Sequence, residues 1–143
     1  MPPAVVSSPE EWRWSFWPFS RKGDELRRAG FVRGLGERLR GGASGVFAVS
    51  VVAEFRTTSG AREETTNEIA VDPAFVAFPV GGIRGGAHGA IMTPTENSYV
   101  VTFSDGRFQY GIFAVFRSSA AGALAKAQVI AAAEALYRRV HGR

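Results

Sequence analysis

The stretch of sequence that decides the fold is YVVTFSDGRFQYGIFAVF, residues 99–116. Side chains alternate in it with the period of a β-strand, and Asp105-Gly106 interrupts the alternation. Because Asp-Gly favours a two-residue type I′ turn, we expect an antiparallel hairpin of strands 99–103 and 108–116. The expected pairs are Phe103 with Phe108, Val101 with Tyr110, and Tyr99 with Ile112.

A second hairpin is predicted earlier in the chain. Residues 46–56 place apolar side chains on one face of a strand, while the other face is apolar at first and charged at its end. Residues 63–71 are expected to return after a turn around Ser59-Gly60. The register that matches apolar with apolar side chains pairs Val49 with Val71, Val51 with Ile69, Phe55 with Thr65, and Arg56 with Glu64.

Between the hairpins lie a short apolar run and a glycine-rich segment. Residues 74–80, bounded by Pro73 and Pro79, are apolar enough for a further strand. Residues 81–89 have the composition of a loop.

Two helices are predicted at the ends of the chain. The first runs from about residue 25 to 40, and its apolar stripe consists of Leu26, Ala29, Val32, Leu35 and Leu39. Its three glycines make it depend on packing. The second, Ala-rich helix covers about residues 120–140. Its buried stripe is expected to be Val129, Ala132, Ala133, Leu136 and Val140, with Ile130 and Tyr137 beside it.

The order of these elements predicts an α+β domain. We expect an antiparallel sheet of four to five strands, made of two hairpins and covered by the N-terminal helix and the long C-terminal helix. Residues 1–20 are interpreted as a Pro- and Trp-rich arm, and residues 21–143 as one domain.

Composition places the chain among globular proteins. It has 143 residues, 45% of them hydrophobic, and no cysteine, which excludes thiol nucleophiles, thiolate zinc sites and disulfides. The sequence shows neither a signal peptide nor an apolar stretch of about 20 residues, so a cytoplasmic location is expected.

Charge is unevenly distributed along the chain. Residues 1–43 and 118–143 each carry a net +3, whereas residues 44–117 carry −2. This distribution suits docking on an acidic surface or self-association. It is too weak to predict nucleic-acid binding.

No constellation of residues typical of an enzyme is found in the sequence. The two histidines, His88 and His141, lack metal-ligand spacing, and Glu63 and Glu64 are adjacent, so on a strand they would face opposite ways. We expect no catalytic residues, no metal site and no cofactor.

An aromatic and basic cluster near the N-terminus is the main candidate for partner binding. It consists of Trp12, Arg13, Trp14, Phe16, Trp17, Phe19, Arg21 and Lys22. Trp and Arg are enriched at interface hot spots, but the rings could equally fold back over the domain's own sheet.

The glycine-rich loop is a second candidate site. Gly82, Gly85 and Gly86 could turn their amides toward an anion, with Arg84 as the counter-charge and His88 as a donor. The alternative is a flexible connector, since the loop matches no phosphate-binding motif.

The sequence therefore favours a non-enzymatic protein-interaction or structural subunit of a homo- or hetero-oligomeric assembly, docking through the aromatic-basic segment. The first alternative is a small-ligand or anion-binding domain that uses loop 81–89. A further alternative is peripheral binding of an acidic membrane surface through residues 12–40.

Overall fold

The computed structural model describes residues 3–17, 23–40, 45–70, 74–84, 86–117 and 122–142. These residues form seven strands and four helices. The strands are β1 (Ala4–Val6), β2 (Phe31–Arg40), β3 (Gly45–Phe55), β4 (Val76–Ala77), β5 (Ala87–Met92), β6 (Glu96–Asp105) and β7 (Phe108–Arg117). The helices are α1 (Pro9–Ser15), α2 (Gly23–Arg28), α3 (Thr58–Ala70) and α4 (Gly122–His141).

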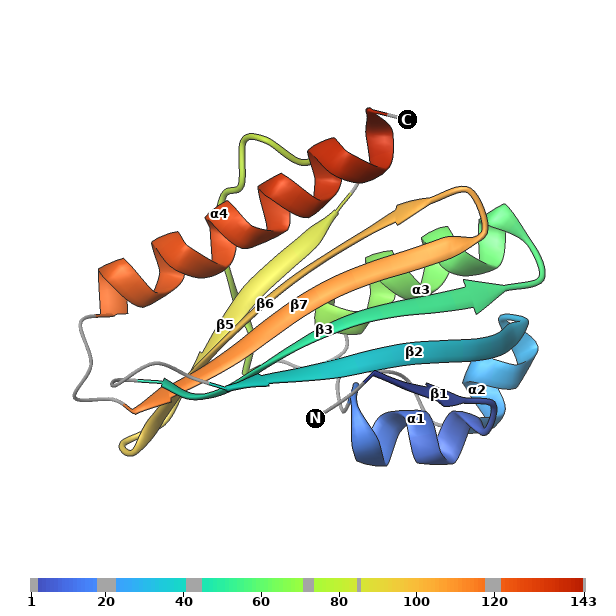
Figure 1. The fold of residues 1–143 in the computed structure, drawn as a ribbon, viewed down its shortest axis with the longest axis horizontal. Coiled ribbons are helices and arrows are strands. Elements are labelled where there is room, and N and C mark those ends of the chain that lie inside the picture. Colours follow the sequence, from blue (N-terminus) through green and yellow to red (C-terminus); the bar gives the residue numbers. More distant parts are fainter. Residues whose placement is uncertain are drawn as a thin grey trace.

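All seven strands join one antiparallel sheet in the order β1-β2-β3-β7-β6-β5-β4. The predicted α+β class with an antiparallel sheet is confirmed, but the sheet has seven strands rather than four or five. Helices α1, α2 and α3 lie on one side of it, and α4 lies on the other (Figure 1).

The hairpin of β6 and β7 is confirmed, with its register shifted by two residues. Phe103 pairs with Tyr110, and Asp105 pairs with Phe108. The two-residue loop is Gly106-Arg107, with a φ of 58° at Gly106 and no positive φ at Arg107. Glycine at the first loop position is the pattern of a type II′ turn rather than type I′. A shift by two keeps every side chain on its predicted face.

The predicted helix over residues 25–40 is wrong. Only Gly23–Arg28 is helical, and Phe31–Arg40 forms strand β2. Gly34 and Gly36 disfavour a helix, whereas on a strand they share one face, where they accommodate the rings of Trp12 and Phe16. Without this helix, the membrane-surface alternative loses its amphipathic element.

The predicted hairpin of residues 46–56 and 63–71 is half right. Strand β3 is present, but residues 58–70 form helix α3, and residues 71–73 lie outside the described residues. The Oγ1 atom of Thr57 accepts a hydrogen bond from the Gly60 N–H at 3.0 Å, which caps the helix start. Strand β3 instead pairs with β2 and β7.

The segment between α3 and β6 contains two strands. Strand β4 lies within the predicted apolar run, and β5 pairs with β6 from Ala87 to Met92. The predicted loop 81–89 is therefore wrong for its last three residues. Residues 87–89 belong to strand β5, which pairs with β6.

Helix α4 is confirmed, and four members of its predicted stripe lie toward the sheet. Val129, Ala133 and Val140 are buried and Leu136 is partly buried, whereas Ala132 is exposed. The helix packs on β6 and β7. Its last turn packs against the hairpin, with the His141 ring 6.2 Å from the Phe103 ring and tilted relative to it.

The N-terminal residues belong to the fold. Strand β1 pairs with β2 at the sheet edge, and Arg38 on β2 donates a hydrogen bond to the Ser15 carbonyl at the end of α1. Ser8 caps the start of α1 by accepting a hydrogen bond from the Glu11 N–H. Residues 4–17 are thus packed on the sheet rather than extended from it as an arm.

Candidate functional site

The aromatic rings of the N-terminal cluster face inward. Trp12 and Trp17 are 1% and 0% exposed, and Phe16 is buried beside them. The Trp17 ring lies against Gly111, at an edge-on distance of 5.6 Å from the Phe113 ring. These three side chains are therefore core residues. None of them is exposed, as the partner-binding role expected for them would require.

The remaining members of that cluster are placed only in part. Arg13 is half-buried on α1, and the Trp14 side chain lies outside the described part of the structure. Phe19, Arg21 and Lys22 also lie outside the described residues.

In the glycine-rich loop, a carboxylate of this chain lies where a bound anionic ligand was expected. The Glu134 side chain of α4 occupies the position that a Cβ on Gly82 would take. Arg84 is exposed, and Gly86 approaches the Thr102 carbonyl too closely for a side chain. Gly85 and the His88 side chain lie outside the described residues. A carboxylate beside Gly82 disfavours a second negative charge there.

An exposed apolar surface lies elsewhere, on the sheet face that carries α4. The register places Val5 beside Leu35, Leu35 beside Val52, and Val52 beside Tyr110. These four side chains form an apolar row across β1, β2, β3 and β7, with Phe108 next to Tyr110 on β7. We call the surface made by Val5, Leu35, Val52, Phe108 and Tyr110 the open strip.

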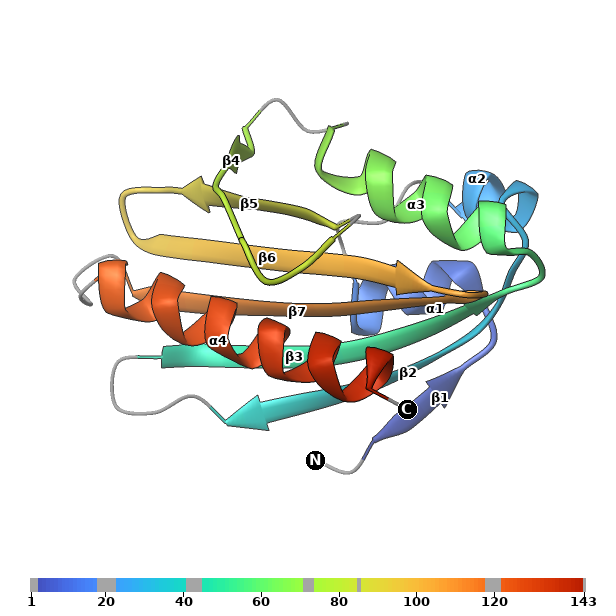
Figure 2. The same cartoon turned by 90° about the horizontal axis from the view of Figure 1, so that it is seen from above.

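The open strip is left uncovered because α4 packs on β6 and β7, away from β1 and β2. Val5, Leu35 and Phe108 are 66%, 39% and 36% exposed. In Figure 2, β1 lies outside α4, at the edge of the sheet. Since large apolar side chains seldom gather on a free surface, this strip is the candidate binding site.

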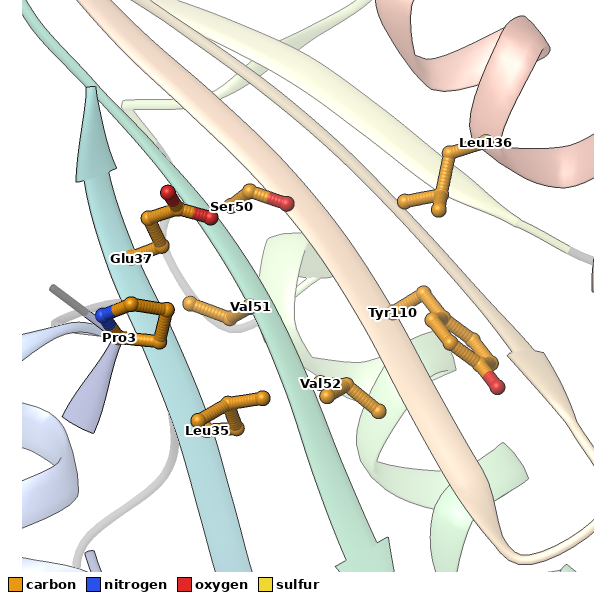
Figure 3. Close-up of a pocket in the computed structure, with 8 residues that line it drawn as sticks. All are labelled: Pro3, Leu35, Glu37, Ser50, Val51, Val52, Tyr110 and Leu136. Atoms are coloured by element: carbon orange, nitrogen blue, oxygen red, sulfur yellow. The ribbon is translucent and has the colours of Figure 1, made fainter. Parts of the chain in front are cut away.

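Two shallow hollows run along the strip. One has a volume of about 150 Å³, and its lining includes Leu35, Val52 and Tyr110, with Leu136 of α4 as a wall (Figure 3). The other has a volume of about 220 Å³ and is lined by Val5, Leu35, Val52 and Phe108, among others. Both hollows are lined by Leu35 and Val52, so they lie side by side along the strip.

Charged side chains flank the strip on both sides. On one side, Arg33 Nε lies 2.9 Å from Glu54 Oε1, and Arg107 Nη2 lies 3.9 Å from the other oxygen of Glu54. On the other side, Glu37 is exposed and pairs across the strands with Ser50. The site thus combines an apolar floor with a charged rim, the usual arrangement at protein interfaces.

Sequence reasoning missed this site because it assigned Leu35 to a helix. The signal was the alternation of Arg33, Leu35 and Glu37 with Gly34 and Gly36, which has the strand period of two.

A polar group is buried on the opposite face, under α3. Gln109 Nε2 donates to Thr102 Oγ1 at 3.1 Å, and Thr102 donates to the Tyr110 carbonyl at 2.9 Å. Glu64 and Thr65 of α3 are 0% exposed on the same side. These groups are closed off from solvent, so they belong to the core rather than to an accessible site.

Within the described ranges, the structure holds no group of three or more His, Asp or Glu side chains placed to bind a metal ion. Among those same residues, no helix is both long and apolar enough to cross a membrane.

No protein-family model matches the sequence, and no curated protein matches it. Among solved structures, one match is the extracellular domain of PknH from Mycobacterium tuberculosis, with 12% identity and a TM-score of 0.39. The match covers 91% of this chain and 74% of that one. At this TM-score the match carries no conclusion about fold or function.

Proposed function

We propose that this chain is a non-enzymatic interaction domain that docks a protein partner on the open strip. The observation that carries the proposal is the apolar row of Val5, Leu35, Val52 and Tyr110 on a sheet face whose other half is covered by α4; Val5 and Leu35 are exposed, and Val52 and Tyr110 are partly exposed. Burying such a row stabilises a complex by roughly 25 cal/mol per Å² of apolar surface removed from water.

A protein partner fits the strip better than a small molecule does. The two hollows, at about 150 and 220 Å³, are open and fall below the roughly 300–1,000 Å³ typical of small-molecule sites. The flat apolar floor with a rim of Arg33, Glu54 and Glu37 has instead the composition of a protein interface.

The test is site-specific photo-crosslinking of the full chain in its source cells. A photoreactive side chain at position 35 should give a discrete adduct, and the same group at position 32 should give none. Val32 is the matched control because it lies on the same strand and is also 39% exposed, but does not line either hollow.

The Phe108→Arg change should remove the position-35 adduct, because it places a charge on the apolar floor. The proposal fails if positions 35 and 32 react alike, or if neither of them yields an adduct.

A further inference from the structure

We infer that Asp105 is a site of spontaneous covalent modification, where the peptide link to Gly106 converts to an isoaspartyl link at a rate that the last turn of α4 limits. The inference does not depend on the proposed function. It follows from the position of Asp105 at the tip of the β6–β7 hairpin and from the contacts that hold this tip closed.

The reaction needs only the aspartate, the next backbone amide and water. The Gly106 nitrogen forms a bond to Cγ of Asp105 while a C–O bond of the carboxyl group breaks. The amide proton leaves with that oxygen as water, and the product is a succinimide ring. Water then adds to one of the two ring carbonyls. Addition at Cγ restores aspartate, whereas addition at the backbone carbonyl carbon gives isoaspartate, in which the chain continues through the side chain.

Asp105 is the aspartate of this chain best placed for the ring closure. The chain has three aspartates, and the residues that follow them are Glu25, Pro73 and Gly106. Proline has no amide hydrogen to give up, and the Glu25 amide lies within helix α2. Glycine leaves the attacking nitrogen uncrowded. Asp105 and Gly106 are both exposed, and a Cβ built on Gly106 meets no atom within 4 Å, so the ring has room to form.

The extended backbone of Asp105 slows the reaction. Asp105 is the last residue of β6 and pairs with Phe108 across the two-residue loop. Ring closure requires the Asp105 backbone to rotate out of the extended conformation, so it proceeds from states in which this last pair is open. Such local opening costs least at exposed turns and strand ends. The rate of modification therefore depends on how often the tip of the hairpin opens.

Two neighbouring elements hold the tip closed. On the β7 side, the Arg107 carbonyl accepts a hydrogen bond from the Phe55 N–H at 2.8 Å. On the β6 side, His141 Nε2 of α4 lies 4.0 Å from Asp105 Oδ1, and the His141 ring stacks on the Tyr137 ring at 4.0 Å. Because His141 contacts the reacting carboxyl group itself, the last turn of α4 opposes its rotation toward the Gly106 nitrogen.

Isoaspartate does not fit the hairpin as it stands. It adds one backbone atom before the Gly106 nitrogen, and it leaves the free carboxylate directly on Cα of residue 105. The added atom changes the length of a two-residue loop, whose length sets the strand register. The modification therefore reaches the open strip, because Phe108 is the partner of Asp105 in the disrupted pair.

The experiment is a long incubation of the purified full chain at neutral pH and physiological temperature, followed by peptide mapping. Electron-transfer fragmentation identifies isoaspartate, and labelling with isoaspartyl methyltransferase measures its amount. Isoaspartate should accumulate at position 105 and not at position 24, which is the internal control. A free peptide of residues 101–110 should react faster than the folded chain, because nothing holds its turn closed.

Variants separate the chemistry from its control by α4. Asp105→Glu should give no product at this position, because the longer side chain would have to close a larger ring. Asp105→Asn should release ammonia and give the same mixture of aspartate and isoaspartate. His141→Ala should raise the rate at position 105 by about two- to fivefold, the change expected on loss of one weak, exposed ion pair. Arg139→Ala, an exposed basic residue in the same turn, is the matched control and should leave the rate unchanged.

Circular dichroism checks that each variant is folded. Absence of isoaspartate at position 105 while the free peptide accumulates it, or equal amounts at positions 24 and 105, would overturn the assignment of the site. A rate in folded His141→Ala no higher than in Arg139→Ala would refute the role of α4. Neither outcome bears on the docking of a partner, which the crosslinking at position 35 tests.

Discussion

Three glycines of the sheet leave space for aromatic rings of the N-terminal segment. Gly34, Gly36 and Gly111 lack the Cβ atoms that would overlap Trp12, Phe16 and Trp17, respectively. The rings can therefore approach the backbone closely and fill the space that larger strand residues would have occupied. Trp17 can occupy its position in the core because Gly111 has no side chain.

The Gly111→Val variant should lower the free energy of unfolding by about 1–3 kcal/mol, because the added side chain overlaps the Trp17 ring. Urea denaturation measures the loss. Gly81→Ala is the control, since nothing lies within 4 Å of a Cβ built at Gly81. Equal stability of the two variants would contradict the ring placement.

At the residue scale, Glu10 makes a pH-dependent contribution to the stability of the native state. A hydrogen bond to its own backbone N–H and the Arg27 guanidinium, 2.7 Å away, hold the pKa of Glu10 below its ordinary value. A pKa lowered by folding means that the ionised group stabilises the native state above the pKa of the unfolded chain. That stabilisation is lost as pH falls through the pKa of the folded chain.

Glu10→Gln should therefore be less stable than wild type at neutral pH, and the difference should disappear in acid. Thermal unfolding at a series of pH values measures it. Glu11→Gln is the control for loss of one charge in the same turn of α1. A difference between Glu10→Gln and wild type that persists undiminished at low pH would contradict this assignment.

At the scale of elements, the secondary structures of β2 and α3 are the reverse of those predicted. Strand β2 was expected to be helical, and most of helix α3 was expected to be a strand. Residues 31–40 contain apolar side chains that fit a helical stripe, yet they alternate equally well as a strand. Helix α3 is polar over most of its length, and it buries Ala61, Glu64 and Thr65 at helical spacing against the sheet. In both segments packing decides the outcome, because local preferences differ by only a few tenths of a kcal/mol per residue.

Deletion of residues 1–20 should abolish cooperative unfolding, because it removes β1, α1 and the buried rings of Trp12, Phe16 and Trp17. Loss of one buried large aromatic ring typically costs about 3–5 kcal/mol, and three together exceed the margin of many domains. Circular dichroism during urea titration measures the effect, and deletion of residues 1–3 is the control. A truncated chain that unfolds at the same urea concentration as the full chain would show that these rings add nothing.

At the scale of the whole molecule, the two faces of the sheet are covered unequally. Among the described residues, three helices lie on one face and α4 lies on the other (Figure 1). Helix α4 packs on β6 and β7, and Val5 of β1 and Leu35 of β2 are exposed. A sheet normally buries both apolar faces, which is why we assign the exposed half to an intermolecular contact. The photo-crosslinking at positions 35 and 32 tests this assignment at the same scale.

The candidate site was the part least accessible to sequence reasoning. Val5, Leu35, Val52 and Tyr110 come from four strands, and two of the three pairings that join these strands, β1 with β2 and β3 with β7, link segments that are far apart in the chain. The aromatic cluster was the stronger sequence signal, because Trp and Arg mark interfaces as readily as cores. Only the positions of Gly34, Gly36 and Gly111 show that these rings turn inward.

The sequence by itself determined the β6–β7 hairpin, strand β3 and helix α4, because a glycine turn, a period of two residues and an Ala-rich composition act over a few neighbouring residues. Only the tertiary structure decided that residues 31–40 are a strand, that residues 58–70 are a helix, and which part of the sheet is left open. Those outcomes depend on contacts between segments that are distant in the chain. The free energies of such contacts cannot be read from a local sequence pattern.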